Sequence, residues 1–257
     1  MRFDQLHEQN SPLIICNVWD VVSAKIADKL GFNAIGTSSA AIATMLGYED
    51  GEQMSFPELI YIVKRIKENT ALPLTVDIET GYGRNSEEIA DHINALSNLG
   101  VVGINIEDSN VNCRLIANNQ RVLLNADEFT QKLYNIKQIL LNKNVEIFIN
   151  VRTDTFLLGV DNAVEETIKR IKLYQSAGAD GIFVPCIDKN NDISSVINGT
   201  KLPVNVMCMP NLPDFNTLKM LGVKRISMGN FIFDNLANHL KNTLHCVLET
   251  QSFKSIF

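Results

Sequence analysis

Short apolar runs alternate with amphipathic segments along most of the chain. Four stretches share one pattern, in which a helical segment ends at a Gly and an apolar run starts about two residues later: 30–39, 99–108, 177–186 and 221–230. Gly is favoured at such helix ends because it adopts the left-handed backbone conformation easily. Four further apolar runs lie between them, at 13–19, 73–79, 145–153 and 202–208. The pattern therefore predicts eight strands.

The segments between these runs predict helices. Apolar residues recur every three or four positions in 56–69, 86–100, 126–142 and 162–178. The second of these segments opens with Ser86 as the expected N-cap, followed by two acids. Strand and helix alternate eight times, and the strands are almost continuously apolar, which is typical of parallel sheets. We therefore expect an α/β fold, a (β/α)8 TIM-type barrel formed by residues 1–257 as a single domain with a C-terminal helix. An open doubly wound sheet is the alternative.

Composition narrows the classes of partner. The hydrophobic fraction of 46% supports a large core, and the net charge of -6 argues against nucleic acid or an anionic membrane as a partner. No stretch of about 18 apolar residues predicts a membrane span. The five cysteines are scattered and contain no CxxC pair, which suits a reducing compartment. We expect a cytoplasmic protein that binds neither nucleic acid nor membranes.

Carboxylates cluster at the predicted ends of neighbouring strands, where barrel enzymes carry their active sites. Asp77 and Glu79 end the third run, and side chains two apart on a strand point the same way. Glu107 ends the fourth run. Three oxygen ligands without a His favour Mg²⁺ or Mn²⁺. The alternative is that these acids pair with Arg or Lys, or cap the next helices.

The residue types missing from the strand ends exclude several chemistries. None of the four His residues, at 7, 92, 239 and 245, lies near a strand end, which argues against a His-ligated zinc or a His base. No Lys ends a strand, so a Schiff-base aldolase is not expected. The chain has no GxxxxGK[ST], and the GYG at 81–83 lacks the rest of a dinucleotide fingerprint.

A possible anion site lies opposite the acids. Ser38 and Ser39 end the second strand, and a hydroxyl with free backbone N–H groups can hold a carboxylate, although such a turn is also a common helix N-cap. Arg152, at the end of the fifth strand, can hold a carboxylate or an enolate oxygen. An ion pair with Asp154 is its alternative role. Trp19 either lines the pocket or packs in the core. A metal with an anion site suits a small 2-oxo acid as the partner molecule.

Four segments together resemble one known family. GTSSAAIATMLGYED, VDIETGYG, GINIED and INVRTDTF, in this order and spacing, resemble the isocitrate lyase/phosphoenolpyruvate mutase superfamily over roughly residues 11–235. The resemblance implies a (β/α)8 barrel, a homo-oligomer (a dimer or tetramer), and Mg²⁺-dependent chemistry on 2-oxo acids through enolate intermediates.

The resemblance also implies roles for individual residues. Asp77 matches the acid nearest Mg²⁺, and its water-bridged partners would be Asp50, Glu79 and Glu107; the superfamily more often has Asp where Glu79 stands. Arg152 matches the Arg that contacts the enolate oxygen, and with Glu107 it forms the expected catalytic pair. The expected substrate-binding residues are Trp19, Asp20, Ser38, Ser39, Ala40 and Arg152.

The chain departs from the superfamily in the loop after the fourth strand. Isocitrate and methylisocitrate lyases carry KKCGH there, whereas this chain has EDSNVNCRLIANNQRVLL, in which Cys113 is a candidate acid with no matching neighbours. Pro185 stands where phosphonomutases have a His. We therefore expect a carbon–carbon lyase or decarboxylase acting on an oxaloacetate- or methylisocitrate-like substrate. Carbon–phosphorus chemistry and a weakly catalytic metal- or ligand-binding barrel are the alternatives.

Overall fold

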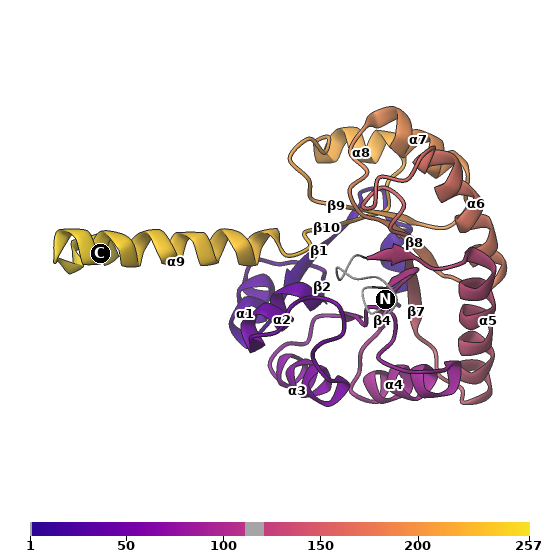
Figure 1. Ribbon diagram of the computed structural model, residues 1–257, viewed down its shortest axis with the longest axis horizontal. Coiled ribbons are helices and arrows are strands. Elements are labelled where there is room, and N and C mark those ends of the chain that lie inside the picture. The colour runs from indigo at the N-terminus through magenta and orange to yellow at the C-terminus, as the bar shows by residue number, and fades with distance from the viewer. Residues whose placement is uncertain (1, 111–120) are drawn as a thin grey trace.

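The computed structural model describes residues 2–110 and 121–257 and shows a closed barrel of eight parallel strands (Figure 1). In order around the barrel, the strands are β1 (Leu13–Val18), β10 (Arg225–Ser227), β9 (Val204–Met207), β8 (Gly181–Val184), β7 (Phe148–Arg152), β4 (Gly103–Glu107), β3 (Leu74–Asp77) and β2 (Ala34–Thr37). Each overlaps one of the eight predicted runs. The barrel prediction is confirmed, and the closed sheet rules out the open doubly wound alternative.

Helices surround the barrel, as the alternating pattern predicts (Figure 1). They are α1 (Val21–Lys29), α2 (Ser39–Leu46), α3 (Phe56–Lys67), α4 (Ser86–Asn98), α5 (Ala126–Asn142), α6 (Ala163–Ser176), α7 (Asn190–Asn198) and α8 (Phe215–Leu221). The chain also forms α9 (Phe231–Thr250), which does not cover the barrel, and the 3-10 turns η1 (Asp4–His7) and η2 (Phe253–Ile256). The prediction of Ser86 as an N-cap is wrong by one residue, because the side chain of Asn85 accepts the hydrogen bond from the backbone N–H of Glu88 at 2.9 Å.

A small antiparallel hairpin stands on the carboxyl end of the barrel, directly after β4. It pairs β5 (Ser109–Asn110) with β6 (Val122–Leu123). Its base is tied to the barrel, because the backbone N–H of Leu124 donates to the carbonyl of Asp108 at 2.8 Å. The hairpin therefore holds the chain on both sides of 111–120 beside the strand ends.

The amino end of the barrel is closed by aromatic packing. The rings of Phe3 and Phe148 meet edge to face at 5.5 Å, and His7 of η1 stacks on Phe148 at 4.6 Å. His7 is buried, and burial lowers its pKa to about 4, with a further contribution from the buried guanidinium of Arg225. The N-terminal turn is thus part of the core.

Helix α9 leaves the barrel and extends away from it (Figure 1). None of its residues is buried, and an apolar stripe runs along it at four-residue spacing: Ile232, Leu236, Leu240, Leu244 and Leu248. Such a stripe normally packs against another surface. No helix within residues 2–110 and 121–257 has the length and apolar character needed to cross a lipid bilayer.

Candidate active site at the carboxyl end of the barrel

The predicted acid–arginine pair forms between two adjacent strands. Glu107 and Arg152 are register partners on β4 and β7. Nη1 of Arg152 lies 2.9 Å from Oε2 of Glu107, an ion pair whose orientation is not that of an aligned hydrogen bond. Both side chains are largely removed from solvent. The structure thus brings the two predicted catalytic residues into contact.

Arg152 also makes the ion pair with Asp154 that was its alternative role. Nε donates to Oδ1 of Asp154 at 2.6 Å and Nη2 donates to Oδ2 at 3.2 Å. Burial alone would lower the pKa of Arg152, but Glu107 and Asp154 more than offset this and hold it above its ordinary value. The guanidinium is therefore permanently charged and held in a fixed orientation.

Glu107 lies between two guanidinium groups. Arg121, directly before β6, donates from Nη1 to Oε1 of Glu107, and Arg152 approaches the other oxygen. Burial raises the pKa of Glu107 to about 8, although both arginines oppose that shift. The carboxylate therefore binds a proton more readily than an exposed Glu, a property found in catalytic acids and bases.

Arg121 is the residue of this cluster that the sequence analysis missed. Its Nη2 donates to Oδ2 of Asp50 at 3.1 Å, and its Nη1 donates to Oγ of Ser109 at 3.0 Å and lies 3.4 Å from Oδ2 of Asp154. Ser109 in turn donates to Asp154. The predicted candidates lie at strand ends, whereas Arg121 comes fourteen residues after Glu107, so the strand pattern does not point to it.

The third strand ends at Asp77, and this changes the interpretation of Glu79. Glu79 has a positive φ of 50°, so the alternation of side chains along a strand does not extend to it. The expectation that it shares a face with Asp77 through strand geometry is wrong. Its backbone N–H instead donates to Oδ1 of Asp77 at 3.0 Å. Burial raises the pKa of Asp77, and Arg152 and a side-chain hydrogen bond from Asn105 oppose the shift.

The carboxylate of Glu79 is held by two residues that the sequence analysis did not single out. The hydroxyl of Tyr82 donates to Oε1 at 2.7 Å, and the backbone N–H of Glu52 donates to Oε2 at 2.6 Å. Burial raises the pKa of Glu79 to about 7, and the negative charge of Asp50 adds to the effect. Glu79 therefore lies within the acidic cluster, although its position comes from turns and not from a strand.

Three left-handed residues shape these turns. Glu52, Glu79 and Tyr82 all have positive φ, between 50° and 57°. Such conformations are unfavourable for residues other than Gly and concentrate at functional sites. Oε1 of Glu52 stabilises them by accepting from the backbone N–H groups of Thr80 and Tyr82, both at 2.9 Å.

Apart from Arg152, which ends β7, the predicted substrate-binding residues lie at the ends of β1 and β2. Ser38 is the N-cap of α2, where its Oγ accepts from the backbone N–H of Ala41 at 3.3 Å, and Ser39 and Ala40 follow it. Asp20 caps α1 by accepting from the backbone N–H of Ser23 at 2.7 Å. The structure therefore shows the helix-capping role that was the alternative for the turn at Ser38 and Ser39. Substrate binding by these residues stays a prediction.

Trp19 is buried after β1. Its ring meets Phe233 of α9 edge to face, with 5.2 Å between ring centroids. This contact links the end of β1 to the first turn of α9. Packing thus explains the position of Trp19, and a role in the pocket wall stays a prediction.

The predicted metal residues suit a cation held largely through water. Within the part of the chain that the structure describes, no three Asp, Glu, His or Cys side chains converge closely enough to bind an ion together. The carboxylates nevertheless repel one another, since the buried Asp77 adds to the rise in the pKa of both Glu79 and Glu107. Mg²⁺ prefers carboxylate oxygens and retains several waters, so one direct ligand with water-bridged neighbours fits this donor set.

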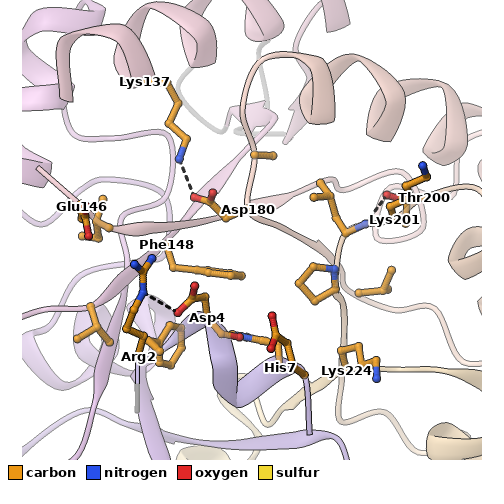
Figure 2. A pocket seen from close by; sticks show the side chains of 18 of the residues that line it. Arg2, Asp4, His7, Lys137, Glu146, Phe148, Asp180, Thr200, Lys201 and Lys224 are labelled. Carbon is orange, nitrogen blue, oxygen red and sulfur yellow. Dashed lines mark hydrogen bonds and ion pairs between the residues drawn. The ribbon is translucent and has the colours of Figure 1, made fainter. Parts of the chain in front are cut away.

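A cavity of about 1120 Å³ lies at the opposite end of the barrel, beside the amino ends of the strands. Figure 2 shows Phe148 and His7 among its lining residues. Two of its ion pairs, Lys137 with Asp180 at 2.7 Å and Arg2 with Asp4 at 3.2 Å, are internal to the lining. Since barrel enzymes react at the carboxyl end, we place the candidate site there. Cys113, the candidate acid of the loop, lies outside the described residues.

The comparisons with known proteins identify the family of this chain. The family model of phosphoenolpyruvate phosphomutase matches residues 3–248. The chain belongs to the phosphoenolpyruvate phosphomutase family. This confirms the resemblance to the isocitrate lyase/phosphoenolpyruvate mutase superfamily that the four motifs indicated.

Three relatives show how far the likeness extends within the phosphoenolpyruvate phosphomutase family. The uncharacterized protein Rv1998c of Mycobacterium tuberculosis (strain H37Rv) is 34% identical over 230 residues, 90% of this chain and 82% of that protein. An oxaloacetate decarboxylase of Paraburkholderia xenovorans is 26% identical over 249 residues, 96% of this chain and 81% of that enzyme. The crystal structure of a proposed phosphonomutase from Burkholderia cenocepacia J2315 has a TM-score of 0.86 at 34% identity and covers 95% of this chain and 97% of that chain. The superfamily is one of lyases and mutases, so the chain is a member of an enzyme superfamily.

Proposed function

We propose that the protein is a divalent-metal-dependent lyase that cleaves a carbon–carbon bond of a small 2-oxo or 2-hydroxy acid, by decarboxylation or by release of a larger fragment. The observation that carries this proposal is the Glu107–Arg152 pair beside Asp77 at the carboxyl end of the barrel. The similarity to an oxaloacetate decarboxylase supports an oxaloacetate-like substrate. A methylisocitrate-like substrate would use the same groups.

The residues divide into an anion side and an acid side. The first turn of α2, at Ser38–Ala40, can hold a substrate carboxylate through backbone N–H groups and the positive end of the helix dipole. Arg152 faces the acids and keeps its charge, so it can stabilise negative charge that develops on an enolate oxygen. Glu107, with a pKa raised to about 8, is the candidate proton carrier.

Asp77 would hold Mg²⁺ or Mn²⁺ directly, with Asp50, Glu79 and Glu107 acting through water. Such a cation, when bound, polarises a substrate carbonyl and offsets the repulsion among these acids. The chain's own contribution is to exclude water and to fix the carboxylates and Arg152 around the reacting carbonyl.

Metal-dependent pyruvate release from oxaloacetate tests the proposal. Pyruvate is measured by coupling to lactate dehydrogenase, and the rate with Mg²⁺ alone is subtracted because oxaloacetate decarboxylates slowly without protein. We expect a protein-dependent rate that disappears with a chelator and in Asp77→Ala. If pyruvate release from oxaloacetate and from methylisocitrate both equal the Mg²⁺ background while oxalate still binds, the protein is a ligand-binding barrel with little catalysis.

Carbon–phosphorus chemistry is a second candidate, supported by the 34% identity to the proposed phosphonomutase. Phosphorus NMR distinguishes it, since the interconversion of phosphonopyruvate and phosphoenolpyruvate moves the resonance between the phosphonate and phosphate regions. Pro185, which stands where phosphonomutases have a His, argues against this candidate. We expect no conversion of phosphonopyruvate.

We further propose that the protein is a homo-oligomer, a dimer or tetramer, in which α9 packs against another copy. Leu236, Leu240, Leu244 and Leu248 of its apolar stripe are each more than half exposed. A 20-residue helix with no buried residue gains little from its own barrel (Figure 1). A second copy of the chain is the partner that would cover this stripe.

A further inference from the structure

Arg121 contacts the same carboxylates that the proposed cation would use. Its two terminal nitrogens bridge Asp50 and Glu107, which come from the α2–α3 connection and from the end of β4. These two acids are far apart in sequence, and Arg121 joins them across the mouth of the barrel. Its side chain is only 13% exposed, so the charge pairs are poorly screened by water.

We propose that Arg121 is the internal counter-ion of the acidic cluster and that a divalent cation binds by displacing it from Asp50 and Glu107. This inference rests on the proposed metal-dependent function. The guanidinium occupies Oδ2 of Asp50 and Oε1 of Glu107, and its positive charge lies where the hydrated cation would be held. The two positive charges repel each other in this poorly screened site, so metal binding is expected to move the guanidinium away.

Of the two arginines, Arg121 is the one that can move, because the carboxylates that hold it, Asp50 and Glu107, are also expected to hold the cation. Arg152 is held at three nitrogens, by Glu107 at 2.9 Å and by Asp154 at 2.6 and 3.2 Å, and Asp154 is not among the expected metal residues. Apart from Asp50 and Glu107, Arg121 has the neutral hydroxyl of Ser109 at 3.0 Å and the carboxylate of Asp154 at 3.4 Å. If Glu107 and Asp50 interact with a cation, Arg121 loses its two closest carboxylates, while Arg152 keeps both of its contacts with Asp154.

The charge balance of the cluster also favours an exchange. Asp77, Glu79 and Glu107 are buried acids at one end of the barrel, and Arg121 joins Asp50 to Glu107, so this cluster gains from positive charge near Asp50. Arg121 supplies it at 3.1 Å. A divalent ion supplies twice the charge of the guanidinium. The exchange therefore has an electrostatic reason that does not depend on any substrate.

Mn²⁺ binding to the full-length chain tests the competition. Arg121→Met removes the charge and keeps a similar stem, and we expect it to bind Mn²⁺ at least about tenfold more tightly than wild type, by electron paramagnetic resonance of free Mn²⁺. Arg121→Lys should fall between the two. The matched control is Arg84→Met, whose side chain is 92% exposed beside Glu88; its affinity should equal that of wild type. Equal or weaker binding by Arg121→Met would overturn the proposal.

A second measurement separates displacement from simple repulsion between charges and needs no variant. Phenylglyoxal modifies accessible guanidinium groups, and peptide mass mapping gives the rate at each Arg. We expect saturating Mn²⁺ to speed the modification of Arg121 several-fold and to leave that of Arg84 unchanged. A rate at Arg121 that Mn²⁺ slows or leaves unchanged would mean that the guanidinium stays on the acids, and the proposal would be wrong.

The Mn²⁺ measurements on wild type and Arg121→Met distinguish a failure of this inference from a failure of the proposed metal-dependent function. If wild type binds Mn²⁺ and Arg121 is unaffected, the competition is wrong while the metal requirement stands. If Arg121→Met binds Mn²⁺ and wild type does not, the competition stands and the metal requirement of the natural protein fails. If neither binds Mn²⁺, both are overturned.

Discussion

Replacing Arg152 by Lys should weaken both the fold and the anion site without unfolding the protein. Arg152 uses three nitrogens on two buried carboxylates: Nε and Nη2 on Asp154, and Nη1 on Glu107. The single ammonium of Lys can replace one of these positions. The other two are interactions with charged groups, each of which contributes about 1.5–3 kcal/mol net.

The expected loss of stability is smaller than the sum of those two interactions. The ammonium still places a positive charge near Asp154 and Glu107, so part of the loss is recovered. We expect Arg152→Lys to lower the free energy of unfolding by about 2–4 kcal/mol. Domains are typically stable by about 5–15 kcal/mol, so the barrel should remain folded. The same change should weaken oxalate binding in the presence of Mg²⁺ by about tenfold or more, roughly 1.4 kcal/mol, because Lys lacks the planar fork.

Urea unfolding followed by circular dichroism measures the first quantity, and titration calorimetry with oxalate measures the second. The matched control is Arg84→Lys, whose ion pair with Glu88 lies on the surface at 3.3 Å; its stability should change by less than about 0.5 kcal/mol. If Arg152→Lys lost no more stability than the control and bound oxalate with wild-type affinity, the buried ion pairs and the anion role would both be refuted.

Three further predictions concern other parts of the molecule. Asp77→Ala should abolish Mg²⁺ and Mn²⁺ binding by calorimetry while the circular dichroism spectrum is kept; unchanged affinity would remove Asp77 from the metal site. His7 is held neutral in the fold with a pKa of about 4, against about 6.5 when unfolded, so the unfolded state binds more protons between these pH values and the stability of wild type falls as pH drops through them. His7→Phe should remove up to about 3 kcal/mol of this dependence between pH 6.5 and 4 in urea unfolding, and identical pH profiles would contradict it. Leu240→Asp with Leu244→Asp on α9 should give monomers in analytical ultracentrifugation, and an intact oligomer would show that α9 is not the interface.

The pattern of apolar residues was sufficient to predict the barrel, because the burial of its strands requires that pattern. Parallel strands buried on both faces must be almost continuously apolar, and the glycine-ended helices before four of them mark where each strand starts. The ends of elements were less certain. Asn85 and Ser86 are both residue types that cap helices well. Which of the two becomes the N-cap depends on the path of the preceding loop.

The site was predictable where a strand carries the residue, and less so elsewhere. Asp77, Glu107 and Arg152 lie on strands, so the order of the strands places them together. Glu79 lies beyond the strand in a left-handed turn, where the two-residue alternation no longer applies. Arg121 and Asp50 are 71 residues apart, and their contact depends on how the hairpin after β4 stands on the barrel. No local pattern contains that information.

The most direct test of the account is the dependence of oxalate binding on Mg²⁺ in the wild-type protein. Oxalate resembles the enolate of a small 2-oxo acid, and titration calorimetry with and without Mg²⁺ measures whether the acids and the anion side act as one site. The account predicts clear binding with Mg²⁺ and at least about a hundredfold weaker binding, roughly 2.7 kcal/mol, when a chelator is present. Equal oxalate affinity under the two conditions would contradict a metal-dependent 2-oxo acid site at the carboxyl end of this barrel.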